Sequence, residues 1–346
     1  MFSALKGLTF DDVVLVPGYN GIKSRQLVTT DVTLKGRNFS LPIISSNMDT
    51  ITEDGMANTI GGLGGMAILH RFLTIDQNVA LFKKIQFKDS TGISIGIGED
   101  GLVRAEALVA AGASIICVDV AHGHSKEVNR TIKALRQKYH DNILIIAGNV
   151  ATYAGADYLA AAGADAIKVG IGSGSVCTTR VKTGFGVPQL TALHDCRQVD
   201  RVLISDGGIR FPSDAVKALA AGADFVMLGG MLAGTDETPG QVLEGTREDG
   251  TKVKFKRFRG MASKEAQDDF MGGMADWKTA EGVAIEVPSR GPVKNVIQDL
   301  MGGIRSGMTY CGAATIKDLQ RKAQFLEVTQ AGRVEGSPHA VGRLTH

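Results

Sequence analysis

In Ala161-Ala162-Gly163-Ala164-Asp165-Ala166-Ile167-Lys168-Val169-Gly170-Ile171-Gly172-Ser173-Gly174-Ser175-Val176-Cys177-Thr178-Thr179-Arg180, a helix end, a buried strand and a glycine-rich loop follow one another. Gly163 marks the helix end, because helices commonly close on a left-handed glycine. The apolar run from Ala166 to Val169 predicts a short buried strand. The chain then enters a turn with glycine at every second position. Together these parts form one βα junction.

The beginning of this stretch recurs elsewhere. Ala110-Ala111-Gly112-Ala113-Ser114 and Ala220-Ala221-Gly222-Ala223-Asp224 are similar to it, and each precedes another apolar run. Eight such runs are rich in Ile, Val and Leu without polar alternation, as strands covered on both faces are. The predicted strands are Leu41–Ser45, Met66–Leu69, Ile93–Ile97, Ile115–Val118, Ile143–Ala147, Ala166–Val169, Val202–Ser205 and Phe225–Leu228.

Stretches of helical period, such as Glu127–Lys138 and Ser213–Ala221, separate most of these strands. Strands that alternate with helices in this way favour an α/β protein with a closed (β/α)8 TIM barrel. A doubly wound open sheet is the alternative, but no GxGxxG follows the first strand. We predict a single catalytic domain over residues 1–346, with a barrel core over about 40–235, a mobile lid over about 236–290 and C-terminal helices and tail over 291–346.

Composition narrows the class of protein. The net charge of +2 gives no electrostatic reason to expect a nucleic-acid or membrane partner. The four cysteines, at positions 117, 177, 196 and 311, form no CxxC pair, so neither a zinc site nor a disulfide framework is indicated. The N-terminus lacks a signal-peptide layout, and no apolar run reaches membrane-spanning length. We therefore expect a soluble, cytoplasmic protein.

Active sites of (β/α)8 barrels lie at the carboxyl ends of the strands, and polar or glycine residues follow the predicted strands there. They are Ser46 to Asp49, His70-Arg71, Asp119 to His124, Gly148-Asn149, the Cys177 loop, Ser205 to Gly208 and Gly229-Gly230. The loops after the last two strands are where barrels often hold a phosphate on glycine N–H groups. Ser175 offers a further hydroxyl. We expect a phosphorylated substrate.

Cys177 is the candidate nucleophile. Peptide N–H groups of the glycine loop and a cation such as Arg180 would stabilise its thiolate. The alternative is a buried cysteine after a structural turn, and the Cys-Thr-Thr-Arg sequence favours the functional interpretation.

Three other features are open to two interpretations. His122 and His124 suggest a metal pair, which we disfavour because no third ligand accompanies them. Asp206 is either a ligand for a ribose hydroxyl or a turn former before two glycines. Ala266–Thr279 has the composition of a mobile lid, and Glu281 at its end is on its own most simply a solvated surface residue.

These motifs together resemble the barrel family of IMP dehydrogenase and GMP reductase. The segment Lys168–Leu190 carries the Gly-Ser-Val-Cys-Thr-Thr-Arg core of that family. Further matching segments are spread over the chain: Leu8–Asp12, Asn47–Thr50, Ala147–Val150, Ser205–Gly208, Met227–Gly230 and Arg290–Val293.

Within the family, the resemblance favours the GMP reductase branch. The short segment between His70 and Ile93 leaves no room for the regulatory CBS insert that dehydrogenases usually carry. The lid from Ser263 to Glu281 contains neither Arg nor Tyr, whereas dehydrogenase lids carry an Arg-Tyr pair that activates water. Tyr310–Ala313 and Trp277–Gly282 are similar to reductase segments.

The chain departs from the family pattern at three places. Ser173 replaces a usual proline, Arg71 replaces the lysine of a His-Lys pattern, and His122-Gly-His124 is similar to dehydrogenases. The alternatives are therefore an IMP dehydrogenase without the insert, a catalytically silent nucleotide-binding protein and an unrelated flavin barrel.

The resemblance implies NADPH-dependent reductive deamination of GMP to IMP and ammonia, a step of purine salvage. Cys177 would attack guanine C2 and form a covalent thioimidate, and Thr179 with Glu281 would relay the proton that the leaving nitrogen needs. The substrate-binding residues implied are Ser175, Asp206, Gly207, Gly208, Gly229, Gly230, Gly260, Met261, Ala262, Ser263, Lys278 and Gly282.

The resemblance also implies a cofactor site, a monovalent cation and a homotetramer. The NADPH-side residues would be Ser24, Arg25, Arg71, Asp119, Val120, Ala121, Ile171 and Gly172, the first two from a neighbouring subunit. Carbonyl groups of Gly172, Gly174, Cys177 and Arg180 would coordinate K+. After the lid, Val293–Met301 and Ile316–Phe325 predict closing helices, and the tail from Gln330 is expected to be loose.

Overall fold

A closed barrel of eight parallel strands forms the centre of the computed structural model, which describes residues 6–246 and 250–338. Sequential strands are neighbours from β4 to β11, and β11 pairs with β4 to close the barrel. The strands are β4 Ile43–Ser45, β5 Met66–Leu69, β6 Thr91–Ile95, β7 Ile115–Asp119, β8 Leu144–Val150, β9 Ala166–Val169, β10 Val202–Asp206 and β11 Phe225–Leu228. Each overlaps one of the predicted runs, so the predicted TIM barrel is confirmed.

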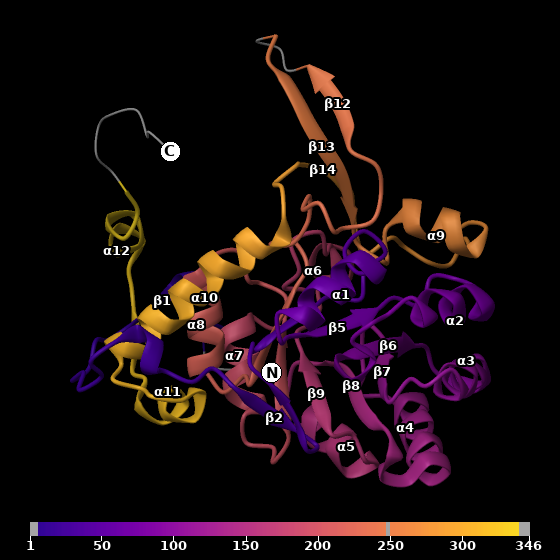
Figure 1. Cartoon of the computed structure of the whole chain (residues 1–346), viewed down its shortest axis with the longest axis horizontal. Coiled ribbons are helices and arrows are strands. Elements are labelled where there is room, and N and C mark those ends of the chain that lie inside the picture. Colours follow the sequence, from indigo (N-terminus) through magenta and orange to yellow (C-terminus); the bar gives the residue numbers. More distant parts are fainter. Residues whose placement is uncertain (1–5, 247–249, 339–346) are drawn as a thin grey trace.

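Helices surround the barrel (Figure 1). They are α1 Asp54–Gly62, α2 Ile75–Lys83, α3 Gly98–Ala110, α4 Lys126–Tyr139, α5 Tyr153–Ala162, α6 Thr179–Thr183, α7 Gln189–Cys196 and α8 Pro212–Ala220. In α4 the buried residues Val128, Ile132 and Leu135 share one face, which is why this otherwise polar segment packs as a helix. Between β5 and β6 the chain forms only α2 and the short η3 Lys88–Ser90.

The repeated Ala-Ala-Gly segments end helices as predicted. Gly112, Gly163 and Gly222 have φ of +100°, +111° and +119°, a backbone region that glycine adopts without steric cost. The chain thereby turns sharply from α3, α5 and α8 into the strand that follows each of them.

A β-hairpin covers the amino-terminal end of the barrel. Its strands are β2 Val32–Leu34 and β3 Arg37–Phe39, and the ring of Phe39 packs edge-on against Phe225 of β11 at 5.5 Å. The Lys35 ammonium, at the turn of the hairpin, lies 2.9 Å from Asp141 and 3.3 Å from Asp165.

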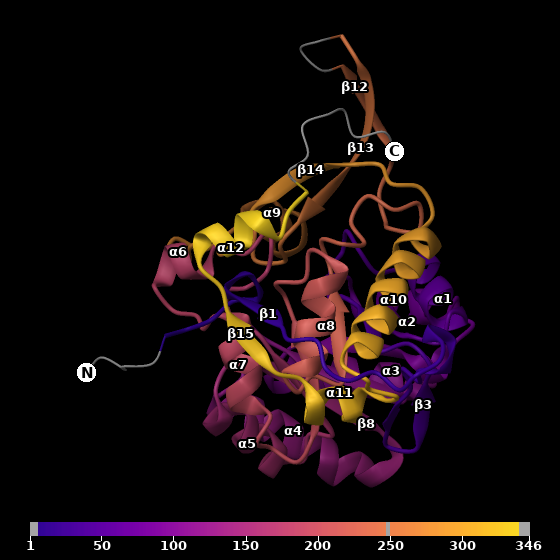
Figure 2. The same cartoon turned by 90° about the vertical axis from the view of Figure 1, so that its left-hand side faces the viewer.

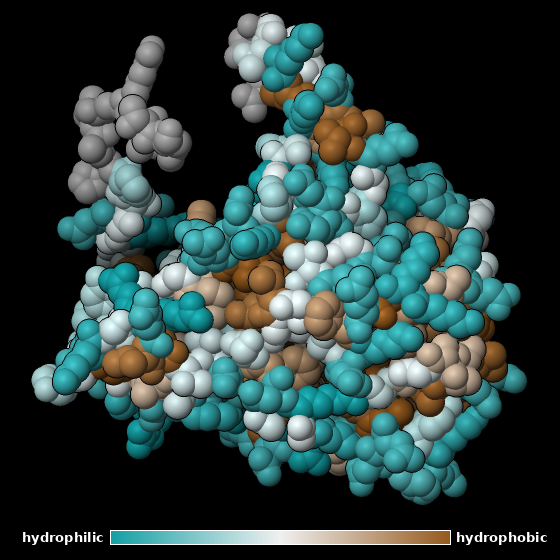
Figure 3. All heavy atoms as spheres, viewed as in Figure 1, coloured by the Kyte–Doolittle hydropathy of each residue, from teal (hydrophilic) through white to brown (hydrophobic). Residues whose placement is uncertain are grey.

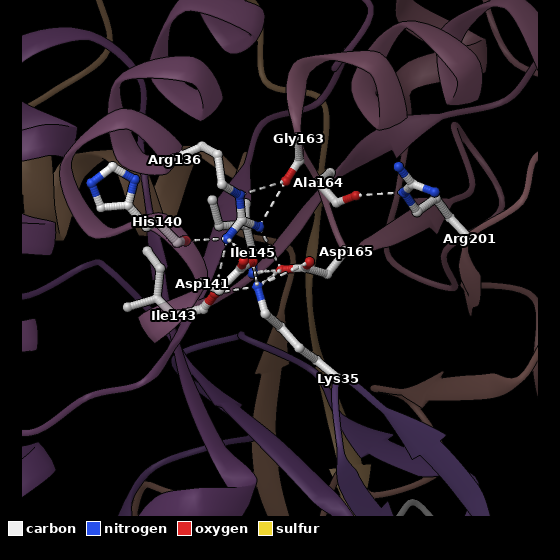
Figure 4. A network of polar contacts seen from close by, with 10 residues as sticks. All are labelled: Lys35, Arg136, His140, Asp141, Ile143, Ile145, Gly163, Ala164, Asp165 and Arg201. Carbon is white, nitrogen blue, oxygen red and sulfur yellow. Dashed lines mark hydrogen bonds and ion pairs between the residues drawn. The ribbon is translucent and has the colours of Figure 1, made fainter.

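Asp165 is the centre of this polar network (Figure 4). Its carboxylate also accepts hydrogen bonds from Arg136 at 2.7 Å and from the Ile145 N–H at 2.8 Å. Ile145 lies near the start of β8 and Asp165 directly before β9, on the side of the barrel opposite to the loops that follow the strands. The network therefore fixes the hairpin to the closed end of the barrel.

Two strands from the N-terminal and C-terminal parts of the chain pair beside the barrel. β1 Val13–Leu15 pairs antiparallel with β15 Phe325–Glu327 (Figure 2). The helices α10 Val293–Tyr310 and α11 Ile316–Lys322 precede β15 in the sequence, and they confirm the two predicted closing helices. The tail was expected to be loose, but α12 Gln330–Glu335 forms there, and its Arg333 lies 3.0 Å from Asp11. Residues 339–346 lie outside the described part of the chain.

A three-stranded antiparallel sheet projects beyond the barrel (Figure 1). It consists of β12 Leu243–Thr246, β13 Lys252–Arg259 and β14 Ala284–Pro288, and β13 is the central strand. The lid segment, residues 260–283, connects β13 to β14 and contains α9 Lys264–Met271. From the sequence, this part was predicted as a mobile lid, and neither the strand β14 nor the helix α9 was assigned to it.

The visible surface is mostly hydrophilic, with small hydrophobic groups, one of them on the projecting sheet (Figure 3). Val242 and Ile285 in this region are 44% and 43% exposed. Over residues 6–246 and 250–338, no helix combines the length and the apolar character needed to cross a membrane.

Candidate active site

A cavity of about 910 Å³ opens at the carboxyl ends of the barrel strands, beneath the lid segment. Loops that follow several strands line it, together with the lid segment and residues 9–11 of the N-terminal segment. The predicted residues that line it are Arg71, Asp119, Val120, Ala121, Ile171, Gly172, Gly174, Ser175, Cys177, Thr179, Arg180, Asp206, Gly207, Gly208, Gly229, Gly230, Gly260, Met261, Ala262, Lys278 and Glu281. The fold thus gathers residues from distant loops into one space.

Cys177, Thr179 and Glu281 form a hydrogen-bonded chain in this cavity. The Cys177 thiol donates to Thr179 Oγ1 at 3.2 Å, and the Thr179 hydroxyl donates to Glu281 Oε2 at 2.8 Å. Cys177 is partly exposed to the cavity, so its sulfur is accessible. The chain provides a direct route for a proton between the sulfur and the carboxylate.

The backbone of the lid segment fixes Glu281 beside the cysteine loop. Gly282 forms an antiparallel bridge with Cys177 and a parallel bridge with Ser263. The Thr178 N–H donates to the Glu281 carbonyl at 2.9 Å, and the Glu281 N–H donates to the Ala262 carbonyl at 3.0 Å. The interpretation of Glu281 as a solvated surface residue is therefore wrong.

Ser263 and Gly282 do not line the cavity. Ser263 is fully buried, and its hydroxyl caps α9 by accepting from the Ala266 N–H at 3.2 Å. Both residues instead hold the lid segment against the cysteine loop, one residue away from groups that do face the cavity.

A buried ion cluster lies at the floor of the cavity. Lys168 Nζ is 2.6 Å from Asp119 Oδ1 and 2.9 Å from Asp206 Oδ2. Burial opposes a charged Lys168, but the two carboxylates outweigh it and raise its pKa. Burial would raise the pKa of Asp119, but Lys168 and a hydrogen bond from Asn47 hold it below its usual value. Lys168 and Asp119 are therefore both charged near neutral pH.

The sequence left two interpretations of Asp206 open, and its carboxylate lines the cavity, as the ligand interpretation requires. Its Oδ2 accepts from both Lys168 and Asn149 Nδ2, the latter at 2.9 Å. Within the described residues no hydrogen bond reaches Oδ1, and the side chain is 22% exposed. One carboxylate oxygen is thus available to a ligand.

The glycine loops that follow β10 and β11 lie directly against the cysteine loop, Gly207 beside Ser173 and Gly230 beside Ser175. A Cβ added at Gly230 would lie 2.8 Å from Ser175 Oγ, and one added at Gly229 would lie 3.2 Å from Met48 Sδ. Gly207 has φ of +97°. Backbone N–H groups can approach a phosphate closely only where side chains are missing, as in these loops.

Ser173 is held firmly although it is not a proline. Its hydroxyl donates to Gln189 Oε1 at 2.9 Å, and Gln189 in turn donates to the carbonyl of Val169 at 2.8 Å. Gln189 is 3% exposed. Side-chain hydrogen bonds therefore constrain the start of the cysteine loop.

Arg180 differs from its predicted role beside the thiolate. Its guanidinium donates to the Val187 carbonyl at 2.5 Å and packs over Gly172 and Gly186. Over residues 6–246 and 250–338, no ion pair or hydrogen bond joins it to Cys177. Its guanidinium thus shapes the loop.

The ligands predicted for K+ are backbone carbonyl oxygens, the ligand type that alkali cations prefer. The Gly174 carbonyl accepts from the Cys177 N–H and the Arg180 carbonyl from the Gly184 N–H, and each keeps a second lone pair. These residues therefore fit a monovalent cation chemically. Within the described residues, no group of three or more His, Cys, Asp and Glu side chains suited to a metal ion is found.

Ser24 and Arg25 are exposed and do not line the cavity of their own chain. Their assignment to a neighbouring subunit remains a prediction. Three residues that the sequence did not single out also belong to the site: Lys168, Gln189 and Phe72. Lys168 was missed because it lies inside an apolar run that predicts a buried strand. A charged residue in such a run is the one sequence signal that could have indicated it.

Arg259 ties the lid segment to the barrel. Its guanidinium lies 2.6 Å from Asp49, which follows β4, and 2.6 Å from Asp269 of α9. It also stacks over Phe270, whose ring packs against Phe72 at 5.5 Å. The hydrogen bonds to Asp49 and Asp269 raise the pKa of Arg259 against the opposing effect of burial.

Comparison with known proteins agrees with this geometry. The family model described as IMP dehydrogenase / GMP reductase domain matches residues 7–339. A GMP reductase from Photobacterium profundum is 41% identical over 336 residues, which are 93% of this chain and 95% of that protein.

Two solved structures are also similar. A Cys-to-Ala variant of GMP reductase from Trypanosoma brucei, in complex with guanosine 5'-monophosphate, is 30% identical with a TM-score of 0.91, covering 98% of this chain and 99% of that one. An inosine 5'-monophosphate dehydrogenase from Legionella pneumophila is 56% identical with a TM-score of 0.84, covering 94% and 100%.

Fold and site define a (β/α)8-barrel enzyme with a cysteine, a threonine and a glutamate joined beneath a lid. The chain belongs to the IMP dehydrogenase/GMP reductase family of oxidoreductases.

Proposed function

We propose that this protein is a GMP reductase, which converts GMP and NADPH to IMP, ammonia and NADP+. The observation that supports it most is the hydrogen-bonded order of Cys177, Thr179 and Glu281. Guanine C2 carries an amine, a poor leaving group, so a nucleophile and an acid must act at the same atom. Cys177 can act as the nucleophile and Glu281 as the acid, and Thr179 joins the two by hydrogen bonds.

In the first step, Cys177 sulfur forms a bond to C2 and its proton passes through Thr179 to Glu281. The same proton then returns through Thr179 to the amino nitrogen, the C2–N bond breaks, and ammonia leaves a thioimidate. NADPH, when bound on the Asp119 side, supplies the hydride that replaces sulfur at C2. Cys177 departs as a thiolate and is reprotonated from solvent, so atoms and charge balance.

The substrate would lie between the two sides of the cavity. One free oxygen of Asp206 suits the ribose hydroxyls. Ser175 and the glycines at 207, 208, 229 and 230 suit the phosphate, and Met261 with its neighbours suits the base. The carbonyl groups of Gly172, Gly174, Cys177 and Arg180 would hold K+, which would steady the cysteine loop.

We further propose a cytoplasmic homotetramer for purine salvage. Ser24 and Arg25 are exposed and stand away from their own cavity, as residues offered to a neighbouring subunit would.

A dehydrogenase is the second candidate, favoured by the 56% identity to the Legionella protein. It would oxidise IMP with NAD to XMP, a reaction in which water must be activated. The lid segment from Ser263 to Glu281 contains no Arg or Tyr for that task. The reductase is therefore the proposal.

Two parallel absorbance assays of the reduced nicotinamide, with K+ present, separate these functions. One contains GMP with NADPH, and the other contains IMP with NAD. A fall in the first with release of ammonia is expected. A rise in the second alone would replace the proposal with the dehydrogenase.

A further inference from the structure

Lys168 is a buried cation in an otherwise apolar strand. It is 1% exposed, and its neighbours in β9 are Ala166, Ile167 and Val169. An ammonium removed from water costs several kcal/mol unless charged partners compensate for it. Its presence at this position therefore calls for a role that an apolar side chain of similar length cannot fill.

The partners of Lys168 come from β10, which pairs with β9, and from β7, which lies beyond β8. Asp119 is the last residue of β7, and Asp206 is the last residue of β10. The ammonium lies 2.6 Å from Asp119 and 2.9 Å from Asp206, so it bridges the two carboxylates. Lys168 therefore lies beneath both the part of the cavity beside Asp119 and the part beside Asp206.

Both carboxylates extend from this floor toward the cavity. The side chains of Asp119 and Asp206 are 27% and 22% exposed, whereas that of Lys168 is 2% exposed. Asn149 makes a second bond to the Asp206 oxygen that Lys168 holds, and Asn47 bonds to Asp119. Each carboxylate is thus anchored from below while it faces the cavity above.

We propose that Lys168 is a positioning residue that couples nucleotide binding to cofactor binding through this shared ion cluster. The inference rests on the proposed function, which gives Asp206 to the ribose of GMP and Asp119 to the cofactor. The Lys168 ammonium binds both carboxylates. If one carboxylate is removed, the ammonium binds the remaining one more tightly. When Lys168 pairs more tightly with Asp206, the Asp206 carboxylate becomes a weaker hydrogen-bond acceptor for the ribose hydroxyls that it would bind.

The first test is a double-mutant cycle on GMP affinity, measured by calorimetry without cofactor. Asp119→Asn should weaken GMP binding about three- to tenfold when Lys168 is present, although Asp119 is assigned to the cofactor. In the Lys168→Met background the same change should alter affinity less than about twofold. Asp157→Asn, which removes an exposed carboxylate of α5, is the control and should have no effect in either background.

The reverse measurement does not depend on Lys168→Met being folded. Asp206→Asn leaves the Lys168 ammonium to Asp119 and should therefore weaken NADPH binding, which is followed by the fluorescence of the reduced nicotinamide without nucleotide present. Cross effects in both directions support the coupling. Absence of both cross effects, or equal effects with and without Lys168, overturns it while leaving the reductase intact. A wild-type protein that binds neither GMP nor IMP overturns the proposed function and this inference with it.

Discussion

The Thr179 hydroxyl donates a 2.8 Å hydrogen bond to Glu281 Oε2, although the two residues are 102 positions apart. The bond joins the loop after β9 to the end of the lid segment, so a closed lid completes the proton chain from Cys177. An open lid would leave the thiol without its carboxylate. Under the proposed function, the reaction would therefore require the closed arrangement of the lid.

This relationship predicts how Glu281→Gln should behave. The amide keeps the shape of the side chain but cannot accept and return a proton, so ammonia release should slow by about 10²-fold or more. Hydride exchange between IMP and the cofactor needs no leaving amine and should be much less affected. Rapid-quench detection of ammonia beside isotope exchange from labelled NADPH into IMP measures the two steps. Equal losses in both would remove Glu281 from the proton relay.

The Arg259 contact predicts that Asp269 stabilises the closed lid. Asp269→Ala removes one of the two carboxylates bound to Arg259 and should lower kcat/KM about two- to fivefold, because an exposed pair contributes up to about 1 kcal/mol. Asp268→Ala is the matched control, since Asp268 pairs with exposed Lys264 in the same helix. Steady-state kinetics of both variants provide the comparison. Identical values for the two would show that Arg259 does not hold the lid.

The four cysteines should differ sharply in reactivity. Burial raises the pKa values of Cys117 and Cys196 to about 12, so both remain protonated thiols well above neutral pH. Iodoacetamide at about pH 8 should therefore label Cys177 and leave these two unmodified in the folded protein.

Peptide mass spectrometry after timed alkylation measures the labelling. GMP should protect Cys177, which lines the cavity, while the rate at partly exposed Cys311 stays constant and serves as the internal control. Labelling of Cys117 before unfolding would contradict its buried position.

The Lys35 network predicts a stability effect without a catalytic one. Lys35→Met removes contacts to Asp141, Asp165 and the Ile143 carbonyl and should lower the free energy of unfolding by about 1–3 kcal/mol. kcat should be unchanged, because the network lies at the closed end of the barrel. Arg130→Ala, which breaks an exposed pair with Glu127, is the control and should cost less than about 0.5 kcal/mol. Urea unfolding of both variants measures the difference, and equal midpoints would refute the anchoring role.

The barrel was predictable because its signals are local. Each strand is a short apolar run, and Gly112, Gly163 and Gly222 mark helix ends through backbone freedom alone. The same logic indicated which loops would share one end of the barrel, so Asp119, Asp206 and Cys177 could be placed together before the structure was known.

The remaining features depend on contacts between distant segments. Nothing local in β9 reveals that Lys168 meets two carboxylates from other strands. The residues around Glu281 have surface-like composition, and only the docking of the lid brings that residue beside Thr179. Arg180 was placed beside the sulfur by proximity in sequence, whereas the turn of the loop directs its guanidinium to Val187.

The pairing of β13 with β14 has an evolutionary consequence. Arg259 and Ala284, which flank the lid segment, are register partners on adjacent strands, so the segment leaves and re-enters the scaffold at one place. Its length and composition can change without moving the barrel strands. Descendants of one ancestral barrel can therefore diverge in reaction by exchanging this insert, while the loops that follow β10 and β11 stay unchanged.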